Sequence, residues 1–235
     1  MSRRPDELRP ILIKRGFPTA APGSVLIECG DTRVLCTASV SSEPPGWLMR
    51  EDPPRGWINA EYNMLPASTK ERKRRGTDGR STEIQRLIGR VLRASVDLYK
   101  MPGLAITCDC EVLSADGGTR TTSITGAFVA LCDAITYALD NGQLKESPIV
   151  TPVAAVSVGI VDGVAVLDLD YPLDSNAEVD LNVAMTEAGE FIEIQGTAEK
   201  GAYSRTQLNQ MLDLAERGMR EIFELQKISL HSPLR

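Results

Sequence analysis

The stretch Asp116-Gly-Gly-Thr-Arg-Thr-Thr-Ser123 joins a strand pattern to a helix pattern. Before it, residues 106–112 alternate apolar and polar side chains, which is the two-residue period of a half-buried strand. After it, apolar side chains from Ile124 to Leu139 recur at helical spacing, and Ser123 is the predicted N-cap. The sequence therefore predicts a strand, a glycine turn and a helix in direct succession.

This turn is suited to binding an oxyanion. A helix N-terminus exposes unpaired N–H groups and the positive end of the helix dipole, where anions bind. Gly117 and Gly118 let the backbone approach a ligand closely, Thr119 adds a hydroxyl donor, and Arg120 offers a planar fork for phosphate oxygens. A plain connection with a solvated arginine fits the same spacing. The turn lacks the motifs of a nucleotide P-loop.

The composition describes an ordinary globular chain. Its 235 residues are 42% hydrophobic and 25% charged, so neither disorder nor a membrane protein is indicated, and we expect a single domain over residues 1–235. No apolar run is expected to reach the length of a membrane span, and the first ten residues do not read as a signal peptide. The expected location is the cytoplasm.

Cysteine and histidine usage excludes several chemistries. The five cysteines lie mostly inside apolar patterns and are expected to be reduced core residues. Cys108 and Cys110 share one strand face without a nearby histidine, so a structural zinc site is not expected. The one histidine, His231, falls in a C-terminal tail predicted to fray. Histidine-dependent hydrolases and histidine-ligated zinc enzymes are therefore disfavoured.

Strand groups alternate with helices along the chain, which predicts an α/β (α+β layered) fold of mixed sheets packed with helices. We expect strands at residues 11–14, 24–29, 32–40, 57–65, 153–161, 164–171, 179–186 and 191–197. Further helices are expected at residues 81–100 and 205–225, the second with a capping box at Ser204 and Gln207.

Basic residues are concentrated in two places, although the net charge is −6. A loop before the helix at 81–100 carries Lys70, Arg72, Lys73, Arg74 and Arg75. This run is either a solvated flexible loop or a local binding surface for phosphates.

The second group belongs to the helix at 81–100. Arg86, Arg90 and Arg93 share one helical face, and Arg80 stands just before the helix. A cation at a helix N-terminus is unfavourable, so Arg80 either binds a shared anion or turns away into solvent.

An acidic cluster lies within thirteen positions: Asp168, Asp170, Asp174, Glu178 and Asp180. Asp180 falls on the more polar face of its strand, and Asp174 lies in the connecting loop six residues earlier. Mg²⁺ often binds one or two carboxylates together with water and phosphate oxygens, so this pair suffices for a magnesium site. Solvation of a turn and a strand edge explains the same residues. Candidates for phosphate and metal in one chain favour phosphoryl transfer.

Taken together, these motifs resemble the ribonuclease PH family of phosphorolytic 3′ to 5′ exoribonucleases over nearly the whole chain. The motifs that carry the resemblance are Pro5–Pro10, Gly23–Leu26, Gly30–Thr32, Val34–Val40, Ala60–Tyr62, Met64–Pro66, Glu83–Arg90, Ala115–Arg120, Ser123–Phe128 and Asp174–Asp180. The loop at residues 41–56 differs in detail from the family pattern.

The resemblance implies a fold like the second domain of ribosomal protein S5, assembled as a homohexamer, a trimer of dimers. It implies that inorganic phosphate binds Arg80, Gly118, Thr119 and Arg120, and that Asp174 and Asp180 are the catalytic acids, with Mg²⁺. The implied reaction removes 3′-terminal nucleotides from tRNA precursors and other RNA as nucleoside 5′-diphosphates, reversibly, in tRNA and rRNA processing.

RNA is expected to follow the basic loop from Lys70 to Arg75 together with Arg86 and Arg90. For at least one of the arginines on the 81–100 helix, an ion pair between subunits is the favoured alternative. Two other functions compete with the main interpretation: a non-catalytic RNA-binding ring subunit of an exosome-like assembly, and a metal-dependent hydrolytic nuclease.

Overall fold

A computed structural model describes residues 3–76 and 78–233 of the chain. Thr77 of the predicted basic loop and residues 234–235 of the C-terminal tail lie outside the described residues. The elements, in order, are β1 (Ile11–Arg15), β2 (Gly23–Cys29), β3 (Thr32–Ser41), η1 (Leu48–Arg50), β4 (Trp57–Met64), α1 (Gly79–Ala94), η2 (Leu98–Lys100), β5 (Ala105–Ser114), α2 (Thr119–Asp140), β6 (Val153–Val161), β7 (Val164–Leu167), α3 (Tyr171–Asn176), β8 (Val179–Thr186), β9 (Phe191–Ala198) and α4 (Arg205–His231).

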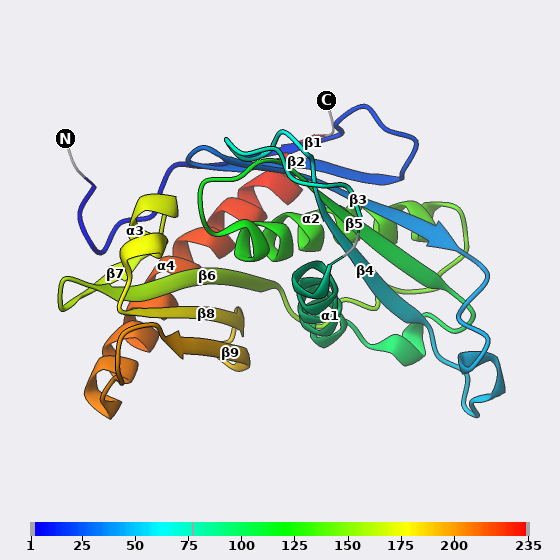
Figure 1. Ribbon diagram of the computed structural model, residues 1–235. Helices are drawn as coiled ribbons and strands as arrows, with labels where there is room; N and C mark the ends of the chain where they lie inside the picture. Colours follow the sequence, from blue (N-terminus) through cyan, green and yellow to red (C-terminus); the bar gives the residue numbers. More distant parts are fainter. Residues whose placement is uncertain (1–2, 77, 234–235) are drawn as a thin grey trace.

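Two sheets organise the chain (Figure 1). The first has the strand order β1-β2-β3-β5-β4. It is mixed, because the edge strand β4 runs parallel to β5 while all other neighbouring strands pair antiparallel. The second has the order β7-β6-β8-β9 and is antiparallel. The predicted α/β arrangement of sheets packed with helices is confirmed.

Helix α2 lies between the two sheets, so it is buried on nearly all sides (Figure 1). A side chain at Gly126 would bring a Cβ within 2.6 Å of Ile27, so glycine allows the helix to pack closely on the first sheet. By length and composition α2 could span a membrane, contrary to our expectation that no segment would, but 78% of that apolar window is buried inside the protein. The predicted burial of all five cysteines, which are free, is confirmed.

Helix α1 covers β4, and its end differs from the prediction. The helix stops at Ala94 rather than continuing to residue 100. The Ser95 hydroxyl bonds to the Leu92 carbonyl, and Val96 forms a bridge with Ile149, so a distant segment draws the chain out of the helix. The short η2 follows, with Asp97 accepting a hydrogen bond from the backbone of Tyr99.

Helix α4 packs on β6 and β7, and the predicted capping box at Ser204 and Gln207 is confirmed. The helix ends at His231 rather than residue 225, so the prediction that this histidine lies in a fraying tail was wrong. The reason is long-range, because Arg15 donates to the carbonyls of Ser229, Leu230 and Ser232 and fixes the last turn.

Two local predictions around the turns were also wrong. Ser123 is not the N-cap of α2, because the helix begins at Thr119 and Gly118 is the N-cap, while the Ser123 hydroxyl bonds back to the Thr119 carbonyl. The strand β7 ends at Leu167, because Asp168 adopts a left-handed conformation with φ 55°. The chain then enters the short helix α3, where we had expected an open loop.

Candidate active site

A cavity of about 680 Å³ is shared by the glycine turn before α2 and the second sheet. Its walls come from α1, the N-terminus of α2, α3 and β8. All six residues predicted to bind phosphate or to act as acids line it: Arg80, Gly118, Thr119, Arg120, Asp174 and Asp180. The structure thus brings together groups that are up to a hundred residues apart in the sequence.

The glycine turn forms one wall and presents a helix N-terminus to the cavity. Gly117 and Gly118 have φ values of 76° and 64°, a left-handed conformation that favours glycine. The first N–H groups of a helix have no intrahelical acceptor, and no side chain caps those of α2. The Thr119 hydroxyl lies 2.8 Å from that of the buried Tyr62, which fixes it under the turn. This wall therefore has the features of an anion site.

Two arginines extend the positive wall. Arg120 lies in the first turn of α2, where its guanidinium donates to the side-chain oxygen of Gln195 and lies 3.5 Å from the carboxylate of Glu83. Arg80 lies in the first turn of α1 and is exposed, whereas we had placed it just before the helix. The Asp78 side chain caps α1 by accepting from Ser81, which offsets the unfavourable cation at this end.

Asp174 on α3 and Asp180 on β8 form an acidic wall of the same cavity. Burial raises the pKa of the Asp174 carboxyl, while nearby Arg80 and Arg120 lower it. Burial raises the pKa of Asp180 to about 6, and the neighbouring Asp174 adds to the rise, which Arg120 and a hydrogen bond from Asn182 oppose. The charge of Arg120 therefore acts on both carboxyls, Arg80 acts on Asp174, and Asp174 acts on Asp180.

The other members of the predicted acidic cluster have different roles. Asp168 is buried in an ion pair with Arg9, Asp170 caps α3 by accepting from Leu173, and Glu178 accepts from the backbone of Gly163. The described part of the chain contains no group of three or more acidic, cysteine or histidine side chains that could hold a metal. A divalent cation here would have Asp174 and Asp180 as its protein ligands.

This pair fits Mg²⁺. Both groups supply hard oxygen ligands, and a bound cation would offset the burial that mainly raises the pKa of Asp180 and the smaller repulsion from Asp174. Two carboxylates are sufficient for Mg²⁺ where phosphate oxygens and water complete the shell.

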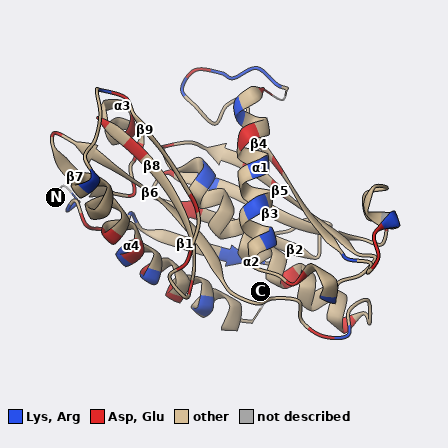
Figure 2. Cartoon of the chain, turned by 90° about the horizontal axis from the view of Figure 1, so that it is seen from below, with Lys and Arg blue, Asp and Glu red and all other residues tan. Residues whose placement is uncertain are grey.

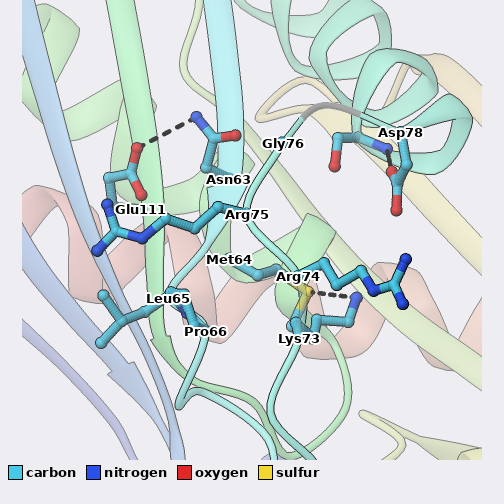
Figure 3. Close-up of a pocket in the computed structure, with 11 residues that line it drawn as sticks. Asn63, Met64, Leu65, Pro66, Lys73, Arg74, Arg75, Gly76, Asp78 and Glu111 are labelled. Atoms are coloured by element: carbon cyan, nitrogen blue, oxygen red, sulfur yellow. Dashed lines mark hydrogen bonds between the residues drawn. The ribbon is translucent and has the colours of Figure 1, made fainter.

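The basic loop borders a second cavity of about 550 Å³, which shares Met64 and Lys73 with the first. Arg74 and Arg75 also line it, and their side chains leave the loop in opposite directions (Figure 3). Lys70 and Arg72 are exposed on the loop and do not line either cavity. Seen with the charges coloured, the loop leading into α1 is predominantly basic (Figure 2).

Neither of the two predicted RNA-binding arginines on α1, Arg86 and Arg90, lines these two cavities. Arg86 is exposed, and Arg90 pairs with Glu193 of β9 within the same chain. Arg93 donates to the carbonyl of Ile58, with its guanidinium 4.5 Å from the centroid of the Trp57 ring.

Several residues of the cavity were missed in the sequence. Tyr171, 63% exposed at the start of α3, and Asn182, beside Asp180, line it, as do Glu199 and Lys200 after β9. Asn182 could have been found, because it lies two residues from Asp180 on the same strand face. Gln195 had no such signal, because its contact with Arg120 joins segments 75 residues apart.

Comparison with known proteins adds family information. Residues 7–136 match the model of the 3′ exoribonuclease family, domain 1, and residues 151–218 match domain 2 of that family. Ribonuclease PH of Corynebacterium glutamicum (strain R) is 55% identical over 97% of this chain and 94% of its own length. Ribonuclease PH of Acaryochloris marina (strain MBIC 11017) is 54% identical over 98% of this chain and 97% of its own length.

Solved structures share the fold. A chain of an Archaeoglobus fulgidus exosome, described as having RNA bound to the active site, superposes with a TM-score of 0.82 at 23% identity, covering 94% of this chain and 90% of its own. A chain of an archaeal exosome core gives a TM-score of 0.78 at 23% identity, covering 96% of this chain and 89% of its own.

Proposed function

This chain belongs to the ribonuclease PH family of 3′ exoribonucleases, and we propose that its cavity is where inorganic phosphate attacks the 3′-terminal phosphodiester of RNA. The chain is a phosphorolytic 3′ to 5′ exoribonuclease and tRNA nucleotidyltransferase. The observation that carries the proposed site is the meeting of an uncapped helix N-terminus and two arginines with two carboxylates in one cavity.

Phosphate, in this proposal, binds between the N–H groups of α2, Arg120 and Arg80. The fork of Arg120 and the helix N-terminus can replace the water around phosphate with fixed donors. The ligand must share Arg120 with Glu83 and Gln195, which both contact the guanidinium. Held in this way, phosphate is the attacking group, so an activated serine, cysteine or histidine is not required.

Asp174 and Asp180 are the residues that would hold Mg²⁺ in this proposal. The cation would neutralise negative charge on the scissile phosphate. Asp180 would act either as a ligand of that cation or, when not bound to it, as the group that protonates the departing 3′ oxygen, since burial raises the pKa of the metal-free carboxyl to about 6. One phosphate oxygen bonds to the terminal phosphorus, and the bond from phosphorus to the 3′ oxygen of the preceding nucleotide breaks. The products are a nucleoside 5′-diphosphate and RNA shorter by one nucleotide.

RNA is proposed to reach this site past the basic loop. The second cavity, with Lys73, Arg74 and Arg75 in its wall, adjoins the first through Met64 and Lys73, so a strand could pass from one to the other. Asn63 and Glu111 also line this second cavity, where Asn63 donates to the Glu111 carboxylate at 3.3 Å, and their remaining polar groups could contact the edges of bases. Lys70 and Arg72 would add charge further out along the loop.

The remaining parts of the proposal concern the setting of the reaction. We infer tRNA precursors as the main substrate, a homohexamer built as a trimer of dimers as the working assembly, and the cytoplasm as the location. These inferences rest on the family resemblance of the motifs. The alternative of a non-catalytic ring subunit has less support, because this chain keeps both proposed phosphate arginines and both proposed acids.

The test is a product analysis. RNA with a free 3′ hydroxyl is incubated with the protein and Mg²⁺, with and without inorganic phosphate, and the released mononucleotides are identified by chromatography. Nucleoside 5′-diphosphates that require added phosphate support the proposal. Monophosphates released without phosphate would indicate a hydrolytic nuclease, and a folded protein that releases no nucleotide would indicate a non-catalytic subunit. Asp180→Asn should release neither product while retaining the fold.

A further inference from the structure

The segment before β1 connects the two sheets. Pro5 accepts a hydrogen bond at 2.7 Å from the backbone of Leu167, at the end of β7 in the second sheet. Pro10 accepts one at 2.9 Å from Gly30, in the turn between β2 and β3 of the first sheet. Between these contacts lies Arg9, which is only 7% exposed although it is charged. A buried arginine in an N-terminal segment requires a buried partner.

That partner is Asp168, which is 3% exposed. Its carboxylate accepts three hydrogen bonds from Arg9, from the backbone N at 2.8 Å, from Nε at 2.9 Å and from Nη2 at 2.7 Å. Arg3 adds a fourth at 3.2 Å from its Nη1 and also binds the Asp168 carbonyl at 2.7 Å. The ion pair is therefore almost saturated with hydrogen bonds, which is the condition for a charge to be buried.

The free edge of the Arg9 guanidinium contacts the glycine turn. Its Nη1 donates to the carbonyl of Asp116 at 2.6 Å. A Cβ on Gly118 would lie 2.9 Å from Arg9 Nη2, and one on Gly117 would lie 2.5 Å from the Leu169 carbonyl. The turn is thus packed between the guanidinium on one side and the chain that follows Asp168 on the other.

Asp168 also determines where the acidic wall begins. Its left-handed conformation, φ 55°, turns the chain off β7, and hydrogen bonds from its own N to the Ser157 carbonyl, 2.7 Å, and from Leu169 N to the Ser157 hydroxyl, 3.0 Å, hold that turn. Asp170 follows as the N-cap of α3, and Asp174 lies within α3. Two residues therefore separate the ion pair from the helix that carries a proposed acid.

We propose that Arg9 and Asp168 are positioning residues that fix the phosphate-binding turn relative to the segment carrying Asp174. Arg9 holds the backbone of the turn, Asp168 holds the start of the acidic segment, and the bidentate contact between them sets the separation of the two walls. The inference rests on the proposed function of the cavity. Lysine cannot replace Arg9 here, because a single ammonium cannot span the carboxylate and the Asp116 carbonyl in a planar fork.

The chain offers a matched control. Arg15 and Asp133 form a second buried pair, 13% and 4% exposed, with Arg15 Nη2 and Asp133 Oδ1 2.5 Å apart. This pair joins β1, α2 and the end of α4, and neither residue lines the proposed active-site cavity. Removing this pair should lower stability as removing the first pair does, but it should leave the positions of the glycine turn and of the acidic segment unchanged.

The experiment compares the double variants Arg9→Met/Asp168→Asn and Arg15→Met/Asp133→Asn with the wild type. Removing both charges leaves only Arg3 without its carboxylate, and that side chain is 19% exposed and keeps its bonds to the carbonyls of Glu7 and Asp168. Asparagine tolerates the left-handed backbone at position 168. For each protein, phosphorolysis of RNA is measured to give kcat, the KM for phosphate and the KM for RNA. Light scattering checks that the proteins have the same oligomeric state, and all assays are run well below the Tm. Arg9→Lys is included, because it keeps the charges balanced if the first double variant does not fold.

The expected result is a loss of about 100-fold in kcat/KM for phosphate in the Arg9 and Asp168 double variant, and a smaller loss in Arg9→Lys. The KM for RNA and the kinetics of the Arg15 and Asp133 control should stay within about twofold of wild type. Wild-type kinetics in Arg9→Lys or in the first double variant, with a lowered Tm alone, would overturn the positioning role. If the wild type itself releases monophosphates without phosphate, the proposed function fails instead, and the two failures are distinguishable.

Discussion

The guanidinium of Arg120 lies 3.5 Å from the carboxylate of Glu83, so the arginine proposed to bind phosphate already has an anionic partner within the protein. Glu83 comes from α1 and Arg120 from α2, and Gln195 of β9 bridges them by accepting from Arg120 and donating to Glu83. Three elements thus hold one side chain at the cavity wall. An incoming phosphate gains an oriented donor but meets a neighbouring negative charge.

Replacing that carboxylate should strengthen phosphate binding. In Glu83→Gln the amide can still accept a hydrogen bond, but the negative charge beside the ligand is gone. Since Glu83 is 41% exposed, solvent screens the effect, and we expect the KM for phosphate to fall about twofold to fivefold with kcat nearly unchanged. Glu193→Gln, which removes the carboxylate that pairs with Arg90, is the control and should leave the KM unchanged. A rise in KM for Glu83→Gln would mean that the carboxylate mainly orients Arg120.

Thr32 supports the glycine turn from below. Its buried hydroxyl donates to the carbonyl of Gly117 at 2.7 Å and accepts from the backbone of Asp116 at 2.9 Å. Thr32→Val preserves the shape and removes both bonds, which should cost about 1–3 kcal/mol of unfolding free energy and raise the KM for phosphate about tenfold. Denaturant unfolding and phosphorolysis kinetics check the two effects.

Thr125→Val is the control for this change, because Thr125 is equally buried on α2 but its hydroxyl makes only 3.5 Å contacts with Ala155. It should leave the KM for phosphate unchanged. A Thr32→Val protein with wild-type phosphate kinetics would show that the turn keeps its shape without this hydroxyl.

Neutralising the basic loop should weaken RNA binding in a salt-dependent way. If Lys73, Arg74 and Arg75 contact RNA phosphates, the triple glutamine variant loses three counterion-releasing contacts. The slope of log Kd for single-stranded RNA against log salt concentration should then decrease by about 2. A charge-matched triple variant on α4, at the exposed Arg217, Arg220 and Lys227, should retain the wild-type slope. An unchanged slope in the loop variant would remove this loop from the RNA path.

Stability at acid pH should depend on Asp168. Burial pushes the pKa of its carboxyl upwards, but the hydrogen bonds and charge of Arg9 outweigh burial and hold the pKa below its ordinary value of 3.8. A depressed pKa in the folded state contributes stability that is present above pH 3.8 and lost as the pH falls through the folded-state value. Wild-type unfolding free energy should therefore drop below pH 3.8, and Arg9→Met/Asp168→Asn should show a shallower drop. Parallel curves would contradict the assignment.

Local patterns predicted much of the fold. The alternation in β5, the Gly30-Asp31 turn between β2 and β3, and the capping box of α4 are decided by neighbouring residues, and the structure agrees with each. The end of α1 was not predictable, because Val96 leaves the helix to pair with Ile149, a partner that no local pattern indicates. The full length of α4 likewise depends on Arg15, more than two hundred residues away.

In the candidate site, too, local patterns predicted some residues, while contacts between distant segments decide others. Gly118, Thr119 and Arg120 were found because strand, glycines and helix are contiguous, and Asp174 and Asp180 because they lie six residues apart. Asp168 was grouped with these acids, yet it is buried with Arg9, which lies 159 residues away in the sequence. A carboxylate in a sequence cluster gives no sign of whether its partner is solvent, a metal or a distant arginine.

Direct measurement of phosphate binding tests the central claim, that the N-terminus of α2 and Arg120 hold free phosphate as the attacking group. Inorganic phosphate is titrated, by phosphorus NMR or calorimetry, into the wild type, Arg120→Met and the control Arg220→Met, which alters an exposed α4 residue that is 72% accessible. The account predicts that Arg120→Met loses at least about tenfold in phosphate affinity, since it removes a bidentate charged contact, while the control binds like the wild type. Equal phosphate affinity in Arg120→Met and the wild type, with both proteins folded, would contradict it.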